Sequence, residues 1–245
     1  MHHLGATRSS LKPDHLLHTP DTFVRTTLPG ATSVEFVIHI APQLGARFTQ
    51  MTAEFDAGGM LGPTPVQRFI YVLAGKLELT VNGAEHILSP GGFAYLPQGR
   101  PHKVQAQVSS RAEIIEKPYE PQAGAAPPEI VVGDEEAMST VLLAGDEALR
   151  VRSLMPDNPA YDFAVNTMTY DPGAALSMVE IHVMEHGLLM LEGGGIYKLS
   201  DAWYPVEAGD FIWMGPYCPQ WFGALGKSPA KYLLYKNWRR HPFGG

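Results

Sequence analysis

The sequence predicts an all-β protein made of two copies of one unit, and three observations lead to that prediction. Glycine and proline are abundant, at 25 and 21 of 245 residues, which favours many turns and short strands over long helices. Short apolar runs rich in β-branched and aromatic residues recur at regular spacing, with turn signals between them. A shift of 118 residues superimposes the second half of the chain on the first. Such a pattern is typical of a β-sandwich or a β-barrel.

The elements of the first copy follow in order from the N-terminus. Residues 1–33 are polar and irregular, and we expect an arm that packs on the body or on a neighbouring subunit. The first strands are expected at residues 34–39, 69–74, 76–81, 84–88 and 93–96. Asn82-Gly83 supplies a hairpin turn between two of these strands, because both turn positions need φ > 0.

The repeat rests on identities at turn glycines and strand starts, where chance identities would not concentrate. The matches pair Leu73 with Leu191, Gly75 with Gly193, Ala84 with Ala202, Gly91 with Gly209, Phe93 with Phe211 and Pro101 with Pro219. The expected hairpin turns also coincide, since Asn82-Gly83 superimposes on Ser200-Asp201. Proline-rich residues between the copies have little to bury and indicate a linker. We therefore expect an arm at 1–33, a first unit at 34–118, a linker at 119–128 and a second unit at 129–245.

Charge and composition exclude several classes of function. The net charge is -7 and no run of Lys or Arg occurs, so nucleic acid and anionic membrane are poor partners. No apolar run is long enough to span a membrane, and the first residues lack the apolar core of a leader peptide. Cys218 is the one cysteine, which excludes an intrachain disulfide and fits a reducing compartment. We expect a soluble, cytoplasmic protein in which Cys218 is a small packed side chain rather than a nucleophile.

Three side chains in the second copy have the spacing of a metal site. Glu180 and His182 are two residues apart, so on a β-strand they point to the same face. A straight strand would place His186 about 20 Å from Glu180, whereas ligand atoms lie only about 2.0–2.2 Å from a transition metal. The chain is therefore expected to turn between His182 and His186.

Gln220 is the fourth candidate ligand, because it superimposes on His102 of the first copy. Its amide oxygen is a hard donor, and it joins one carboxylate and two imidazoles in a set without thiolates. Such a set favours Mn²⁺ or Fe²⁺ over a structural zinc ion, and the ligand chemistry alone does not separate those two ions.

A different motif overlaps these residues. The run from His182 to His186 also matches H-x-x-E-H, a peptidase motif in which one helix presents both histidines. Here Val179, Ile181 and Val183 alternate in the manner of a strand, and glycine follows the second histidine at once. We therefore predict a strand and a turn rather than a helix, which disfavours the peptidase.

The first copy lacks the corresponding donors. Arg68 stands where His186 would be, and residues 63–67 contain no His, Asp or Glu. Arginine keeps its charge and has no lone pair to donate. Because His102 alone cannot hold an ion, we expect the first barrel to be metal-free and structural.

The second copy also has polar side chains that suit a bound anion. Tyr232 and Lys236 share strand parity and can both face the interior, and Tyr197 lies in the strand after a glycine-rich turn. A lysine buried on a core strand is costly unless an anion meets it, which near a metal suggests a substrate carboxylate. The alternative is that Lys236 is the exposed end of a terminal strand.

Two motifs resemble those of a known fold family. Gly91, Pro97, Gly99 and His102 resemble the second cupin motif, and the run from Glu180 to Gly193 resembles the first. The resemblance implies a bicupin, which is two jelly-roll β-barrels in tandem.

The second half resembles one family of bicupins more specifically. The residues that carry this resemblance are Glu180, His182, His186-Gly187-Leu188-Leu189, Leu191-Glu192-Gly193, Tyr197, Trp203-Tyr204-Pro205-Val206, Ala208-Gly209-Asp210, Pro219-Gln220-Trp221, Ala224-Leu225-Gly226-Lys227 and Tyr232-Leu233-Leu234-Tyr235-Lys236. They are similar to the (S)-ureidoglycine aminohydrolase family, Mn²⁺-dependent bicupins of purine (allantoin) catabolism. Members of that family release ammonia from (S)-ureidoglycine to give (S)-ureidoglycolate.

The resemblance implies roles for seven residues. Glu180, His182, His186 and Gln220 would be the ligands of Mn²⁺, or of Fe²⁺ or another divalent ion. Tyr197, Tyr232 and Lys236 would be catalytic and would bind a small ureido substrate together with Glu180. A homo-oligomer is expected. Two alternatives remain open: a metal-dependent cupin dioxygenase, and a bicupin that binds a small molecule without catalysis.

Overall fold

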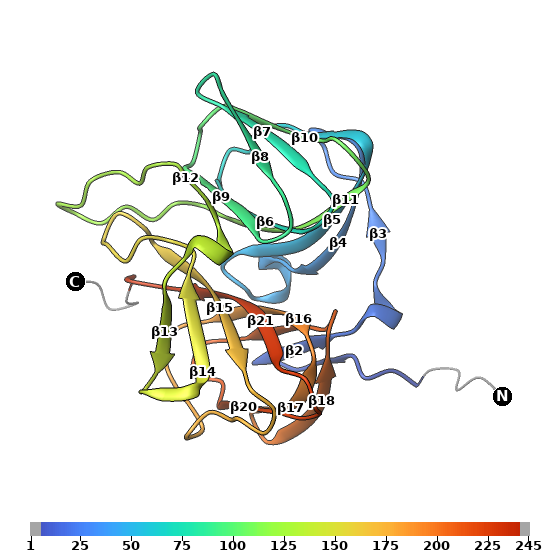
Figure 1. The fold of residues 1–245 in the computed structure, drawn as a ribbon, viewed down its shortest axis with the longest axis vertical. Coiled ribbons are helices and arrows are strands. Elements are labelled where there is room, and N and C mark those ends of the chain that lie inside the picture. The colour runs from blue at the N-terminus through green and yellow to red at the C-terminus, as the bar shows by residue number, and fades with distance from the viewer. Residues whose placement is uncertain (1–5, 241–245) are drawn as a thin grey trace. The chain divides into compact units, whose positions relative to one another are not determined.

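The structure is a computed structural model that describes residues 6–240, and strands account for most of the described chain (Figure 1). Three short 3₁₀ helices lie between the strands: η1 (Pro20–Thr22), η2 (Pro42–Leu44) and η3 (Glu135–Ala137). The predicted all-β class is therefore confirmed. In the described part of the chain, no helix is long and apolar enough to cross a membrane.

The chain divides into two compact units. The N-terminal unit contains residues 24–138 and 154–162, and the C-terminal unit contains residues 1–23, 139–153 and 163–245. The first five residues of the expected arm and the last five of the expected second unit lie outside the described residues. Each unit has its own apolar core.

The N-terminal unit is one ten-stranded antiparallel sheet with the order β12-β9-β6-β11-β5-β10-β7-β8, while β4 pairs with β5 and β3 with β4. Its strands are β3 (Arg25–Thr26), β4 (Ala31–Ile40), β5 (Thr49–Leu61), β6 (Gln67–Ala74), β7 (Leu77–Val81), β8 (Ala84–Leu88), β9 (Gly92–Leu96), β10 (His102–Ala106), β11 (Ser110–Lys117) and β12 (Val131–Asp134). Alternate residues of these strands form the core, as Ile70 and Val72 do in β6. Every second side chain can face inward because the strand period is two.

The C-terminal unit has an eight-stranded sheet with the order β1-β2-β19-β16-β21-β15-β14-β13 and a three-stranded sheet with the order β18-β17-β20. Its strands are β1 (Ser10–Leu11), β2 (His15–His18), β13 (Thr140–Leu143), β14 (Asp146–Ser153), β15 (Phe163–Tyr170), β16 (His186–Glu192), β17 (Gly194–Leu199), β18 (Ala202–Glu207), β19 (Phe211–Met214), β20 (Gln220–Ala224) and β21 (Ala230–Asn237). Both sheets contribute to one core, in which Leu188 of β16 joins Phe222 of β20. A core enclosed by two sheets is the jelly-roll arrangement that the motifs imply.

The boundaries of the two units differ from the expected residue ranges. Residues 6–23 of the arm belong to the C-terminal unit, because β2 pairs with β19 and places Leu17 opposite Ile212, while residues 24–33 belong to the N-terminal unit. Arg8 fixes the arm further through hydrogen bonds to Asp210 at 2.5 and 2.9 Å. In turn, β12 pairs with β9 of the N-terminal unit, although residues 129–138 were expected in the second unit. An open sheet edge exposes unpaired backbone groups, and both pairings cover such an edge.

Turn geometry repeats at the 118-residue shift. Asn82 and Ser200 both have φ of 52°, so the two hairpin turns share a left-handed residue at the same place. Gly75 and Gly193 have φ of 82° and 64°, and a Cβ on either one would lie 2.5 Å from a backbone oxygen. These two positions require glycine both for the sign of φ and for the close approach of the backbone.

Strand register gives a second equivalence between the units. Pairing of β6 with β11 places Arg68 opposite Glu116, and pairing of β16 with β21 places His186 opposite Lys236. Since Arg68 and His186 are equivalent in the repeat, Glu116 occupies the place of Lys236. The two barrels therefore have opposite charges at this position.

Candidate metal centre and active site

The irregular segment 171–185 and the start of β20 carry three of the four predicted ligands. Glu180 forms an isolated bridge with Gln220, with Glu180 N donating to Gln220 O at 2.8 Å and Gln220 N donating to Glu180 O at 3.0 Å. Tyr217, which precedes β20, also bonds to this segment, because its N donates to His182 O at 2.8 Å. These backbone bonds hold the three side chains beside one another independently of a metal.

The prediction that Glu180 and His182 lie on a β-strand is wrong. Residues 171–185 form irregular backbone with only isolated bridges, and β16 begins at His186. The alternating apolar residues Val179 and Ile181 are 41% and 62% exposed, so they do not cover a core. The alternation predicted a strand because period-two patterning normally marks a buried face. The segment from His182 to His186 is not helical either, which removes the structural basis for the peptidase motif.

The predicted ligand side chains converge on the ring of His182. His186 Nε2 lies 3.2 Å from His182 Nε2, and the Gln220 amide nitrogen lies 2.7 Å from the same atom. The Glu180 carboxylate is the loosest member, with Oε2 at 3.9 Å and a side chain that is 42% exposed. The amide nitrogen and oxygen of Gln220 exchange places on a half-turn of the amide, so either can face the histidine.

Burial keeps His186 neutral. Desolvation, and then the charges of His182 and Lys236, lower the pKa of His186 to about 3. A neutral imidazole offers a lone pair, and two Nε2 atoms that face each other both suit a shared cation. One carboxylate, two imidazoles and one amide therefore fit a divalent ion with nitrogen and oxygen ligands.

Three tyrosines lie in the core of the same unit: Tyr170 on β15, Tyr197 on β17 and Tyr232 on β21. Their hydroxyls stay protonated, because burial raises the pKa of each one above its usual value. The hydroxyls of Tyr170 and Tyr232 are 2.7 Å apart. Tyr170 was not predicted from the sequence, because it lies ten residues before Glu180 and resembles an ordinary core aromatic residue.

Lys236 lies on the same face of β21 as Tyr232 and Leu234, which are core residues. Its cross-strand partner is His186, and its Nζ is 4.9 Å from the ring centroid of Trp238. The strand continues to Asn237, so Lys236 is not the last residue of a terminal strand. The lysine is half-buried at the side of the histidine pair.

The N-terminal unit holds an arginine at the corresponding place. Arg68 is 4% exposed, and its Nη1 lies 2.8 Å from His102 Nε2 and donates to Gly62 O at 2.7 Å. Its Nε donates to Glu116 Oε1 at 2.7 Å. The permanently charged guanidinium thus lies among the groups that would otherwise face a cation at this place in the unit.

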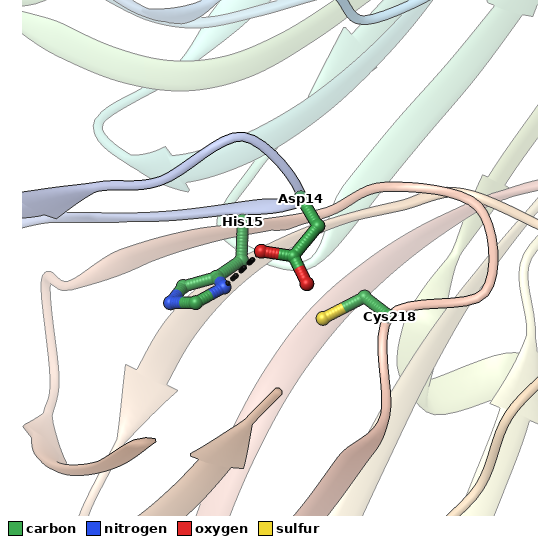
Figure 2. Close-up of side chains that lie close together, drawn as sticks. All are labelled: Asp14, His15 and Cys218. Carbon is green, nitrogen blue, oxygen red and sulfur yellow. Dashed lines mark hydrogen bonds and ion pairs between the residues drawn. The ribbon is translucent and has the colours of Figure 1, made fainter. Parts of the chain in front are cut away.

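A second cluster of donor atoms lies outside the predicted site. One ligand atom from each of Asp14, His15 and Cys218 lies within 4.8 Å of the others (Figure 2). Both ring nitrogens of His15 already have partners, since Nδ1 is 2.8 Å from Asp14 and Nε2 is 2.9 Å from the Tyr204 hydroxyl. Burial raises the pKa of the Cys218 thiol to about 11. The cluster is internally satisfied, and a cation would have to displace one of these hydrogen bonds.

Comparison with known families defines the class of the protein. The cupin domain model matches residues 52–116 and 166–235, together more than half of the chain. Both matched segments fall in a jelly-roll unit, so the protein is a bicupin. The resemblance drawn from the motifs is confirmed at this level.

Curated relatives identify the family within that class. The chain is 40% identical over 242 residues to the (S)-ureidoglycine aminohydrolase of Arabidopsis thaliana, which covers 97% of this chain and 80% of the relative. It is 30% identical over 230 residues to the (S)-ureidoglycine aminohydrolase of Escherichia coli K12, which covers 90% of this chain and 87% of the relative. The chain belongs to the (S)-ureidoglycine aminohydrolase family of hydrolases.

Solved structures share the fold of this chain. The crystal structure of protein Ylba from E. coli superimposes with a TM-score of 0.86 at 28% identity, and the match covers 97% of each chain. Oxalate decarboxylase from Bacillus subtilis superimposes with a TM-score of 0.69 at 12% identity, which shows a shared fold alone.

Proposed function

We propose that this protein releases ammonia from (S)-ureidoglycine and gives (S)-ureidoglycolate, with the help of one divalent metal ion in the C-terminal unit. The observation that supports the proposal is the pair of histidine Nε2 atoms 3.2 Å apart, which belongs to a chain 40% identical to a named (S)-ureidoglycine aminohydrolase. In this reaction the elements of water add at the carbon that carries the amine, and ammonia leaves.

In this proposal the metal is held by His182, His186, Gln220 and Glu180, and Mn²⁺ is the preferred ion. The donor set lacks thiolates and includes a carboxylate and an amide oxygen, which favours a harder ion such as Mn²⁺ over structural zinc, while Fe²⁺ is the closest competitor. When bound, a divalent ion supplies a Lewis acid that orients and polarises a chelating substrate. The 42% exposure of Glu180 leaves its carboxylate free to turn toward such an ion or toward the substrate.

Lys236 is the proposed partner of the substrate carboxylate. Its ammonium group is half-buried, and the ring of Trp238 lies on one side of it. A cation in such a place gains most from an anion that replaces its lost water. The same ammonium could pass a proton to the departing amine, and both roles use the Nζ atom.

Tyr197 and Tyr232 are the proposed donors to the ureido group. Each is 3% exposed or less, and each keeps its hydroxyl proton at neutral pH because burial raises its pKa. Neutral phenols suit an uncharged carbonyl oxygen, since they donate a hydrogen bond without adding charge. Holding the ureido group would fix which face of the reacting carbon meets water.

The wider setting is also part of the proposal. The reaction would belong to allantoin degradation in purine catabolism, in the cytoplasm, and the protein would act as a homo-oligomer. The buried, unpaired thiol of Cys218 suits a reducing compartment.

The test is an ammonia-release assay with freshly generated (S)-ureidoglycine. Metal-free protein and protein reloaded with Mn²⁺ are compared, and the product is analysed for chirality. We expect release that depends on metal and gives the (S) product. Oxygen uptake during turnover would instead indicate a dioxygenase, and bound Mn²⁺ without ammonia release would indicate a binding protein; either outcome overturns the proposal.

A further inference from the structure

A pair of buried tyrosine hydroxyls in the C-terminal unit lies beside a methionine sulfur. The Tyr170 and Tyr232 hydroxyl oxygens are 2.7 Å apart, and the Tyr232 hydroxyl also donates to Met168 Sδ at 3.3 Å. Each hydroxyl has only one proton to give. Either hydroxyl could donate in the bond between the two oxygens, but both contacts are made together only when Tyr170 donates to Tyr232 and Tyr232 donates to the sulfur.

The acceptor that holds the Tyr232 proton is a weak one. A thioether sulfur is a poor hydrogen-bond acceptor compared with a carbonyl oxygen. The Tyr232 hydroxyl can therefore turn from Met168 to a ureido oxygen at little cost, while it keeps the bond from Tyr170. Donation from Tyr170 also polarises the Tyr232 hydroxyl and strengthens the bond that Tyr232 gives.

The rings of the two tyrosines are held in place by Phe222. Phe222 is fully buried and packs edge-on against both rings, with centroid distances of 4.9 Å to Tyr170 and 5.7 Å to Tyr232. This packing restrains both rings and keeps the two hydroxyls within bonding distance. Such packing is what a preorganised donor requires.

The N-terminal unit has the same fold without this pair. Register places Ala112 at the position of Tyr232 and Ala53 at the position of Met168, because Ala112 pairs with Ala53 as Tyr232 pairs with Met168. Phe55 takes the place of Tyr170 by the same pairing. The fold thus does not need the hydroxyl pair. The pair occurs only in the unit that carries the four candidate metal ligands, among the described residues of the two units.

We propose that Tyr170 is a positioning residue for substrate recognition: it donates to Tyr232, which directs the Tyr232 proton to the ureido carbonyl of the substrate. This inference rests on the proposed function and assigns a role to a residue outside the predicted site. Tyr170 acts through Tyr232 and does not itself touch the substrate.

The test is a double-mutant cycle on the metal-loaded enzyme. Tyr170→Phe should raise KM for (S)-ureidoglycine by about tenfold and change kcat by less than about twofold, because the lost interaction holds substrate and transition state alike. In a Tyr232→Phe background, the same change should add less than about twofold to KM. Tyr235→Phe is the matched control, since Tyr235 is buried on the opposite face of the same strand. An equal factor in both backgrounds, or no effect of Tyr170→Phe, would overturn the inference.

A second readout uses the metal-free protein and needs no activity. A hydroxyl proton in a short, buried bond exchanges slowly and gives a downfield proton resonance. We expect one such resonance that disappears in Tyr170→Phe and remains in Tyr235→Phe. Its persistence in Tyr170→Phe would show that Tyr170 is not the donor. If this signal behaves as expected while the wild-type protein releases no ammonia, the hydroxyl pair stands and the proposed function fails.

Discussion

The guanidinium of Arg68 lies 2.8 Å from Nε2 of His102, whereas the equivalent residues of the other barrel, His186 and Gln220, both contact His182. Under the repeat, His102 superimposes on Gln220 and Arg68 on His186. One barrel thus carries a built-in organic cation where the other gathers donor atoms that suit a metal. The two copies have kept one fold and diverged in how the charge at this place is supplied.

Arg68→Met should destabilise the N-terminal unit. The change leaves Glu116 and His102 without their buried partner, and breaking a buried ion pair typically costs about 3 kcal/mol. The loss of stability is measured by urea unfolding monitored with far-UV circular dichroism. Arg25→Met is the matched control, because the Arg25–Glu54 pair is exposed and its removal should change the unfolding midpoint far less. Equal effects of the two changes would contradict the argument.

His186→Ala should remove the metal. Loss of one imidazole from a four-ligand set is expected to lower the bound Mn²⁺ by more than about tenfold, because even indirect partners of ligands cost that much. Inductively coupled plasma analysis after dialysis gives the metal content per chain. His102→Ala serves as the control and should leave the content unchanged. Metal that follows His102 rather than His186 would move the site to the other barrel.

Lys236→Met should separate catalysis from metal binding. Ammonia release is expected to fall by about 100-fold or more, since an acid–base or charge-pairing group is lost, while the Mn²⁺ content stays near the wild-type value. Lys231→Met, on the opposite face of β21, is the control and should retain most of the activity. A parallel fall of metal and activity in Lys236→Met would argue for a structural role of the lysine.

Glu113→Gln should change how the stability of the N-terminal unit depends on pH. Burial raises the pKa of Glu113 to about 7 from its usual 4.5, while hydrogen bonds from Thr52 and Gln50 oppose the shift. The folded state therefore binds a proton between these values that the unfolded state does not. The stability contributed by this group is fully present below pH 4.5 and is lost as the pH rises from 4.5 through about 7. Between these two values the free energy of unfolding falls by about 1.4 kcal/mol per pH unit.

The measurement is urea unfolding at pH 5, 6, 7 and 8, with the wild-type protein and Glu113→Gln compared at each pH. The variant should gain stability relative to the wild type as the pH increases, because an amide carries no charge to desolvate. A difference that does not vary with pH would show that Glu113 does not titrate in this range.

Much of the fold could be predicted from local chemistry. The strand expected at residues 84–88 is β8, and the turn at Asn82-Gly83 has the positive φ values that a tight hairpin needs. Gly193 could be matched to Gly75 because both positions forbid a side chain. Local steric limits act within a few residues, so the sequence alone carries them.

Other features depended on distant contacts. The alternation around Ile181 predicted a strand, yet the segment is irregular and is held by backbone bonds to Tyr217 and Gln220. The arm was expected to pack on the body or on a neighbouring subunit, and only the structure shows that β2 completes the sheet of the C-terminal unit beside β19. Tyr170 could not be singled out, because its partner Tyr232 is 62 residues away in the chain.

The sequence by itself determined the all-β class, the duplication, the turn positions and the family of the chain, since each depends on residue type and spacing. The tertiary structure alone decided which backbone bonds hold Glu180 beside Gln220, which face of β21 Lys236 shares, and which hydroxyl Tyr170 meets. The physical reason is that a hydrogen bond or a donor cluster requires atoms within about 3 Å, and only the folded chain brings distant residues so close.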